Sequence, residues 1–182
     1  MNKTRLAILG ILIPAILGGA FMYWNLLYAG YAELTADEVG EIQLISVVSG
    51  LPEAILSENV KGIDTVKEGV RLSGPVSFRA CFTTPSSLAM LTDSYVIQEN
   101  AVPLNAPSWF ECFNAQDIGA ALESGEAIPF VSQKNISFGV DRVVAVLPDG
   151  RGFVWHQLNA CGEAVFAGDD APEGCPEFPE DS

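Results

Sequence analysis

The longest hydrophobic stretch of the chain lies at its N-terminal end, where the 27 residues from Leu6 to Ala32 carry no charge. As a helix rising about 1.5 Å per residue, this stretch reaches roughly 40 Å, which exceeds the ~30 Å hydrocarbon core of a bilayer. Tyr and Trp residues, which favour the headgroup level, gather toward its far end. The pattern predicts a single transmembrane helix.

The charges on either side of this stretch predict its orientation. Lys3 and Arg5 precede it and acidic residues follow it, so the positive-inside tendency leaves the N-terminus in the cytoplasm and exports the remaining ~150 residues. The alternative is a signal peptide cleaved at Gly18-Gly19-Ala20 or Gly30-Tyr31-Ala32, but the apolar run is too long for the hydrophobic region of an ordinary signal peptide. We therefore expect a single-pass inner-membrane protein with a periplasmic domain.

Beyond the span, apolar runs bounded by Gly and Pro predict β-strands at 42–48, 76–82, 128–131, 142–147 and 152–158. The alternation in 76–82 predicts one buried face. Residues 143–147 are apolar at every position, so we expect that strand to be covered on both faces. Pro148-Asp149-Gly150 predicts the turn of an antiparallel hairpin.

Capping residues predict two short helices. Thr84 is the expected N-cap of the first, with Pro85 at its first helical position and an apolar face made by Leu88, Leu91 and Tyr95. Asn114 caps the second, which Gly125 ends. Residues 57–74 are expected to be irregular, and residues 98–108 to form a loop.

These elements predict an α+β fold, with a mostly antiparallel sheet and two short helices after the transmembrane helix. The expected organisation is a cytoplasmic stub and span at 1–32, a polar stalk at 33–41 and a periplasmic domain at 42–182, which ends in an acidic, Pro-rich tail. One domain of this size buries a sizeable core.

All four cysteines lie beyond the span, and an even number in an exported domain indicates two disulfides. We favour Cys81–Cys112 and Cys161–Cys175, because the second bond would hold an acidic tail that otherwise resembles a disordered segment. No Cys-x-x-Cys pair is present, which disfavours zinc, c-type haem and thioredoxin chemistry.

The charge balance excludes one class of partner and favours another. Residues 33–182 carry 23 acids and seven bases, a net charge of −16, which repels nucleic acid. The same field would steer a basic partner, such as a basic soluble electron carrier or the basic face of a membrane complex. The alternative is that the charge only maintains solubility.

The candidate reactive residues indicate no catalytic set. His156, the single histidine, alternates with Trp155, so the two side chains should lie on opposite faces of a strand. A general base or metal ligand is conceivable, but a packed histidine is the commoner case. Trp155 and Trp109 are expected in a core or interface. We expect Arg79, Arg142 and Arg151 to pair with carboxylates, and Asp169-Asp170 with Glu173 to be a solvated tail rather than a calcium site.

The C-terminal half also resembles a known group of sequences. The segments RACFTTPSSLAMLT (79–92), APSWFECFNAQDIGAALESGEA (106–127), GVDRVVAVLPDGRGFVWHQLNACGE (139–163) and PEGCPE (172–177) look like an uncharacterised alphaproteobacterial family of single-pass, membrane-anchored periplasmic proteins. The resemblance implies no assigned activity and transfers no catalytic residue. Some relatives carry a histidine kinase label, which this sequence contradicts, since its sole histidine lies in an expected strand beyond the membrane.

The sequence therefore predicts a non-catalytic docking protein without a cofactor. Its expected partners are the lipid bilayer and other membrane-complex subunits, which would make it an accessory subunit of a respiratory or photosynthetic complex. The alternative is a periplasmic assembly factor or a module that binds a metal, lipid or peptide.

Overall fold

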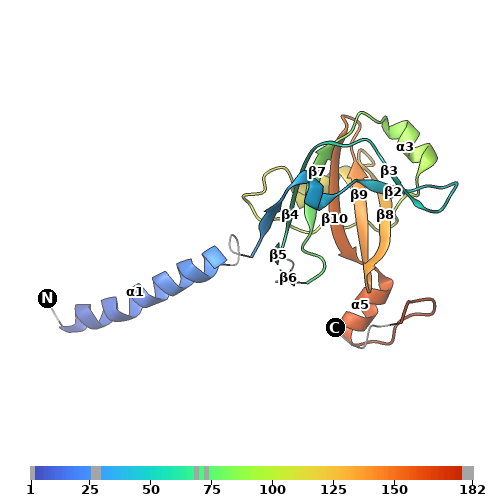
Figure 1. The fold of residues 1–182 in the computed structure, drawn as a ribbon. Helices are drawn as coiled ribbons and strands as arrows, with labels where there is room; N and C mark the ends of the chain where they lie inside the picture. The colour runs from blue at the N-terminus through green and yellow to red at the C-terminus, as the bar shows by residue number, and fades with distance from the viewer. Residues whose placement is uncertain (1–2, 26–29, 68–69, 72–73, 178–182) are drawn as a thin grey trace.

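The structure is a computed structural model that describes residues 3–25, 30–67, 70–71 and 74–177, without the side chains of residues 3–7, 66–67 and 70–71. The N-terminal helix α1 (Lys3–Trp24) extends away from the rest of the protein (Figure 1). Within the described residues, no helix combines the length and the apolar character that crossing a membrane requires. Lys3 and Arg5 lie near the start of α1, but their side chains are outside the described part of the structure. Tyr28, one of the aromatic residues toward the far end of the uncharged stretch, also lies outside the described residues.

A six-stranded antiparallel sheet forms the centre of the domain (Figure 1). Its spatial order is β1 (Ala32–Leu34), β4 (Glu58–Asp64), β7 (Arg79–Thr83), β10 (Arg151–Leu158), β9 (Val140–Val146) and β8 (Ile128–Ser137). The expected α+β fold is thereby confirmed, and so is the β9–β10 hairpin, whose turn places Gly150 at φ +86°.

The expectation that residues 57–74 are irregular is wrong, because β4 lies within them, followed by β5 (Val66–Lys67) and β6 (Val70–Arg71). The strand pattern of β4 is interrupted by a bulge, where Asn59 takes a positive φ. Gly62 also breaks the pattern, because a Cβ there would lie 2.4 Å from Val39 Cγ2. Asn59 and Gly62 make the segment look irregular in the sequence, but the bulge and the close contact with Val39 account for them in the fold.

The predicted polar stalk at 33–41 is also wrong, since these residues belong to the folded domain. β1 pairs with β4, with Leu34 opposite Gly62. Helix α2 (Ala36–Val39) follows, and its capping box pairs Thr35 with Glu38. Val39 at its end is buried in the core. The segment looks like a polar stalk because most of its residues are polar or small. Its buried Val39 and the capping box of Thr35 and Glu38 nevertheless hold it against the sheet.

Both faces of the sheet are covered. One face packs Phe130, Val144, Val146 and Val154 beneath the N-terminal elements, whereas the other packs residues that include Val143, Ala145 and Trp155 beneath the 98–114 loop. The prediction that 143–147 is covered on both faces is therefore confirmed. The prediction of one buried face for 76–82 is incomplete, because residues 79–82 are buried on both sides.

A second layer of strands continues from the edge of the sheet. β2 (Gln43–Ile45) pairs with β3 (Pro52–Ala54), and residues 95–98 lie between β2 and β8, with Val96 N–H donating to Ile45 O and Gln98 N–H to Pro129 O. The predicted strand at 42–48 is thus real but ends at Ile45.

The helices agree with their expected positions in one of two cases. Helix α4 (Ala115–Glu123) is capped by Asn114, as predicted. Helix α3 (Leu88–Ser94) is capped by Ser87 rather than Thr84. The reason is that Thr84 N–H is bonded to Gly150 O at the end of the sheet, so the helix begins one turn later.

The two predicted disulfides, Cys81–Cys112 and Cys161–Cys175, are both formed. The first joins β7 to the loop before α4. The second joins helix α5 (Ala160–Ala167), which the sequence analysis did not predict, to the acidic tail.

Candidate functional site

Three strongly exposed aliphatic side chains lie together at the tip of the β2–β3 hairpin. Val47 is 59% exposed, Val48 94% and Leu51 65%. Met90 of α3 is 43% exposed, and the C-terminal end of α3 is joined to the tip because Ser94 O accepts a hydrogen bond from Val47 N–H. We call these four side chains the hairpin surface.

Hydrogen bonds fix the backbone beneath the hairpin surface. Ser46 N–H donates to Leu51 O and Gly50 N–H to Ser46 O, with Gly50 at φ +67°. The Ser49 hydroxyl donates to Glu53 Oε1 at 2.8 Å and accepts from Leu51 N–H at 3.2 Å. The side chains are therefore presented by an ordered turn, so binding them would require little further ordering of the backbone.

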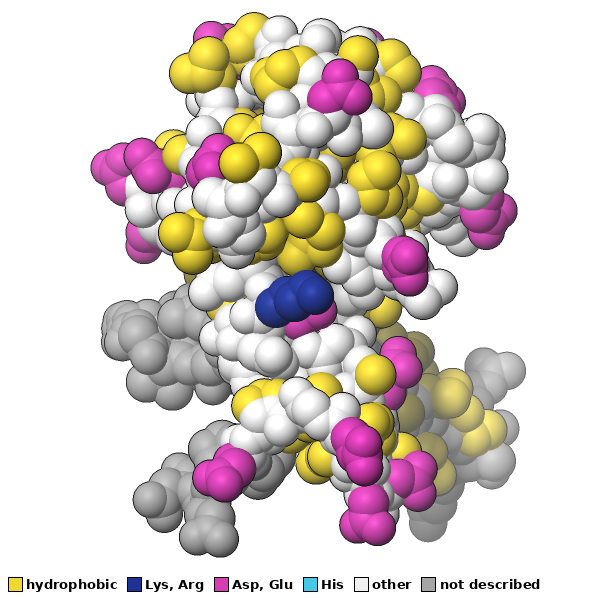
Figure 2. All heavy atoms as spheres, turned by 90° about the vertical axis from the view of Figure 1, so that its right-hand side faces the viewer, with side chains coloured by type: hydrophobic (Ala, Val, Ile, Leu, Met, Phe, Trp, Pro, Cys, Tyr) yellow, Lys and Arg dark blue, Asp and Glu magenta, His cyan; other side chains and the backbone are white. Residues whose placement is uncertain are grey.

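Negative charge surrounds this surface. Residues 33–60 and 80–133 contain Asp and Glu but not one Lys or Arg, and these two stretches supply the hairpin and α3. Figure 2 shows hydrophobic side chains gathered over the upper part of this face, with Asp and Glu spread around them and a Lys or Arg side chain below them. An apolar surface with an acidic surround is suited to a partner that carries bases around an apolar contact.

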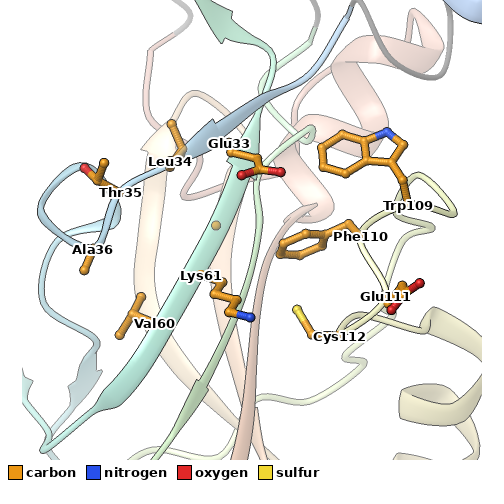
Figure 3. Close-up of a pocket in the computed structure, with 11 residues that line it drawn as sticks. Glu33, Leu34, Thr35, Ala36, Val60, Lys61, Trp109, Phe110, Glu111 and Cys112 are labelled. Atoms are coloured by element: carbon orange, nitrogen blue, oxygen red, sulfur yellow. The ribbon is translucent and has the colours of Figure 1, made fainter.

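A groove of about 630 Å³ lies beside β1 and β4 (Figure 3). Trp109 and Phe110 come from the loop that Cys112 attaches to the sheet, and Lys61 from β4. The carboxylates of Glu33 and Glu111 also line it. This combination of aromatic faces and both signs of charge can hold a peptide or an amphipathic small molecule.

His156 is engaged in a buried network. Its Nδ1 lies 2.9 Å from Pro75 O, and Arg142 Nε donates to its Nε2 at 3.0 Å. Because a carbonyl oxygen only accepts and the arginine Nε only donates, the ring in this arrangement is neutral and carries its proton on Nδ1. The ring is 3% exposed and stacks on Phe78 with centroids 4.8 Å apart. Trp155 lies on the other face, as predicted.

The three arginines differ in their partners. Arg151 forms the predicted ion pair, with Nε 2.7 Å from Asp149 Oδ2. The expectation of a carboxylate partner does not describe the hydrogen bonds of Arg79, whose guanidinium donates to four backbone carbonyls: Val76, Phe78, Leu104 and Asn105. Burial lowers the pKa of Arg79 to about 10, while the charges of Tyr31 and Asp64 act in the opposite direction.

Arg142 likewise departs from the expectation of a carboxylate hydrogen bond. It donates to His156 and lies over the Phe78 ring at 4.8 Å. Burial lowers the pKa of Arg142, and the negative charge of Asp64 opposes that shift. The two arginines occupy interior positions because their planar guanidinium groups satisfy several acceptors or an aromatic face at once.

The remaining candidates lie on the surface or in the core. Asp169, Asp170 and Glu173 are exposed on the tail. Within the part of the chain that is described, no group of three or more His, Cys, Asp or Glu residues could hold a metal ion. Trp155 is fully buried, whereas Trp109 lines the groove.

The hairpin surface does not emerge from the sequence pattern, because Val47 and Val48 fall within a predicted strand. The signal that could have found it is Ser49-Gly50 followed by Pro52, a turn sequence that interrupts the apolar run.

Comparison with known proteins adds one match. The model of a family of unknown function (DUF6446) matches residues 42–176. No curated protein matches the chain, and no solved structure does.

Proposed function

We propose that this chain, which belongs to the family of unknown function DUF6446, is a non-catalytic docking protein whose hairpin surface binds a basic partner protein. In its most specific form, the proposal makes the chain an accessory subunit of a respiratory or photosynthetic membrane complex, held at the inner membrane with its domain in the periplasm.

The observation that carries the proposal is the exposed apolar tip. Three aliphatic side chains, at least 59% exposed, stand on a turn that hydrogen bonds already hold in place. Fully burying one such side chain is worth about 1.5–3 kcal/mol. A partner that covers all three therefore gains enough hydrophobic free energy to offset part of the entropy lost on association.

The charge around the tip selects the partner. Glu53 is bonded to the turn itself, and Asp93 lies on α3. Because neither contributing stretch contains a base, an acidic surface is repelled and a surface rich in Lys or Arg is attracted. A basic electron carrier or a basic face of a membrane complex has this chemistry.

Three features support attachment to the membrane and export. The uncharged run from Leu6 to Ala32 continues eight residues past the end of α1. The described apolar side chains of α1, from Ile8 to Trp24, are exposed and lie apart from the domain core. Two disulfides are typical of an oxidising compartment such as the periplasm.

Co-purification tests docking. The tagged full-length protein is extracted from native membranes in mild detergent, and partner chains are quantified. We expect a stoichiometric partner that is lost in the variant Val48→Ser/Leu51→Ser. The control variant Val102→Ser, at a position as exposed as Val47 but outside the hairpin, should retain the partner. Recovery of the native protein as a lone monomer, or retention of the partner by the double variant, would refute the proposal.

A separate measurement tests location. We expect the protein to stay in the membrane fraction during alkaline carbonate washing, and added protease to degrade its domain in spheroplasts but not in inside-out vesicles. Release by carbonate, or the opposite pattern of protection, would refute the membrane and periplasmic parts while leaving the docking part intact.

The groove favours a second candidate function, a periplasmic assembly factor or ligand-binding module. Trp109 and Phe110 offer aromatic faces in a space of about 630 Å³. Native mass spectrometry separates the two functions: a retained small molecule that Trp109→Ala removes supports the module, whereas stoichiometric partner chains support the docking protein.

A further inference from the structure

Helix α5 is apolar on nearly every side and contributes little to the core. Its sequence, ACGEAVFA, contains one charged residue, Glu163. Gly162 is its buried position, and the other residues are half-buried or exposed. Phe166 in particular is 58% exposed. A helix with this composition normally packs its apolar residues against another surface.

Several contacts nevertheless hold α5 in one place. Asn159 Oδ1 accepts hydrogen bonds from Cys161 N–H and Gly162 N–H, and its Nδ2 lies 2.8 Å from Asp141 Oδ1. Gly162 packs directly against Gly139, since a Cβ on Gly162 would lie 2.2 Å from Gly139 O. The Cys161–Cys175 disulfide then attaches the tail. These contacts fix a helix whose own burial is small.

Helix α5 and the described tail after it are themselves acidic. Residues 160–177 contain five carboxylates: Glu163, Asp169, Asp170, Glu173 and Glu177. No Lys or Arg occurs after Arg151. This charge disfavours an anionic bilayer as the surface that covers Phe166 and favours a basic protein segment.

The position of α5 separates it from the hairpin surface. Figure 1 shows α5 at the lower end of β9 and β10, whereas β2, β3 and α3 lie around the upper part of the sheet. We propose that residues 160–177, the α5 arm, form a second docking surface that binds a protein segment with apolar residues flanked by Lys or Arg. The domain would then bind two basic segments at once, and the second surface does not depend on the first.

A two-site titration tests the proposal. The probe is a synthetic amphipathic peptide of Leu and Lys, titrated calorimetrically into the full-length protein in a neutral detergent, and a Leu and Glu peptide of the same pattern serves as a control. We expect two Leu/Lys peptides per chain and no binding of the acidic peptide. Phe166→Ser should weaken one site about tenfold and leave the other within twofold.

The hairpin variant separates this inference from the proposed function. Val48→Ser/Leu51→Ser should weaken the other site and leave the α5 site intact; failure of that variant alone refutes the hairpin surface, not the α5 arm. Cys161→Ser/Cys175→Ser should weaken the same site as Phe166→Ser while the circular dichroism of the sheet is unchanged.

Three outcomes would overturn the proposal. The first is unchanged binding by Phe166→Ser. The second is a dimer, seen by sedimentation, that Phe166→Ser dissociates, because a second copy would then cover α5. The third is co-flotation of the nanodisc-held protein with phosphatidylglycerol vesicles that Phe166→Ser abolishes, because a lipid surface would then cover it.

Discussion

The two disulfides differ in what they hold, and this difference predicts unequal effects on stability. Cys81–Cys112 closes a loop with a sequence separation of 31 and attaches the layer that contains Phe110 and Phe113 to the sheet. By the entropy of loop closure, its removal costs about 4 kcal/mol. Cys161–Cys175, with a separation of 14, would cost about 3 kcal/mol by the same relation.

The full 3 kcal/mol should not be observed for Cys161–Cys175, because Gly162 is the one buried residue of α5 and the described tail after it is mainly exposed. We expect Cys81→Ala/Cys112→Ser to lower the free energy of unfolding by about 4 kcal/mol, a fall in Tm of roughly 8–16 °C. Cys161→Ser/Cys175→Ser should lower it by about 1 kcal/mol or less, because the bond constrains chain outside the cooperative unit.

The assay is urea unfolding of the full-length protein in detergent, followed by tryptophan fluorescence, to which the buried Trp155 contributes. Equal losses for the two double variants, or a larger loss for the second, would refute the reasoning, since the α5 arm would then belong to the cooperative core.

Three further predictions concern single side chains. Arg79→Lys should lower the unfolding free energy by about 3 kcal/mol, because an ammonium group has three N–H donors and cannot satisfy all four carbonyls; unchanged urea midpoints would contradict this. Gly152→Ala should cost about 1–3 kcal/mol in the same assay, since its Cβ would lie 2.2 Å from the Phe82 ring, and a neutral result would mean that the ring moves freely. Hydrogen bonds from Thr35 lower the pKa of Glu38, so the contribution of its carboxylate to folding stability is present above pH 4.5 and is lost as the pH falls. Glu38→Gln should therefore flatten the acid side of the plot of unfolding free energy against pH. An unchanged plot would exclude the capping box as the source of that pH dependence.

The parts of the fold that follow local rules could be predicted from the sequence. The continuous apolar run of β9 and the Pro-Asp-Gly turn determine a buried hairpin through short-range preferences. The Asn114 cap is likewise local. The disulfide pairing followed from the composition of the tail, because a segment rich in acids and proline needs a covalent tie to stay ordered.

The parts that depend on tertiary contacts could not. β4 has a strand conformation although Asn59 and Gly62 interrupt its pattern, because β1 and β7 pair on either side of it. The hairpin surface was hidden for the opposite reason: Val47 and Val48 have high strand propensity, but the turn between Ser46 and Leu51 takes them out of the sheet. Sequence patterns report what is apolar, and the fold decides which apolar residues remain exposed.

Two short edge strands, β1 of the six-stranded sheet and β3 of the β2–β3 pair, carry a consequence for crowding. β1 and β3 each have three residues, and β3 begins with Pro52, which has no backbone N–H to donate. Two copies that met edge to edge would therefore gain few main-chain hydrogen bonds, and fibrous stacking is disfavoured even at high local concentration. Any lasting assembly has to be built from side chains, which leaves its specificity open to change by single substitutions on the surface.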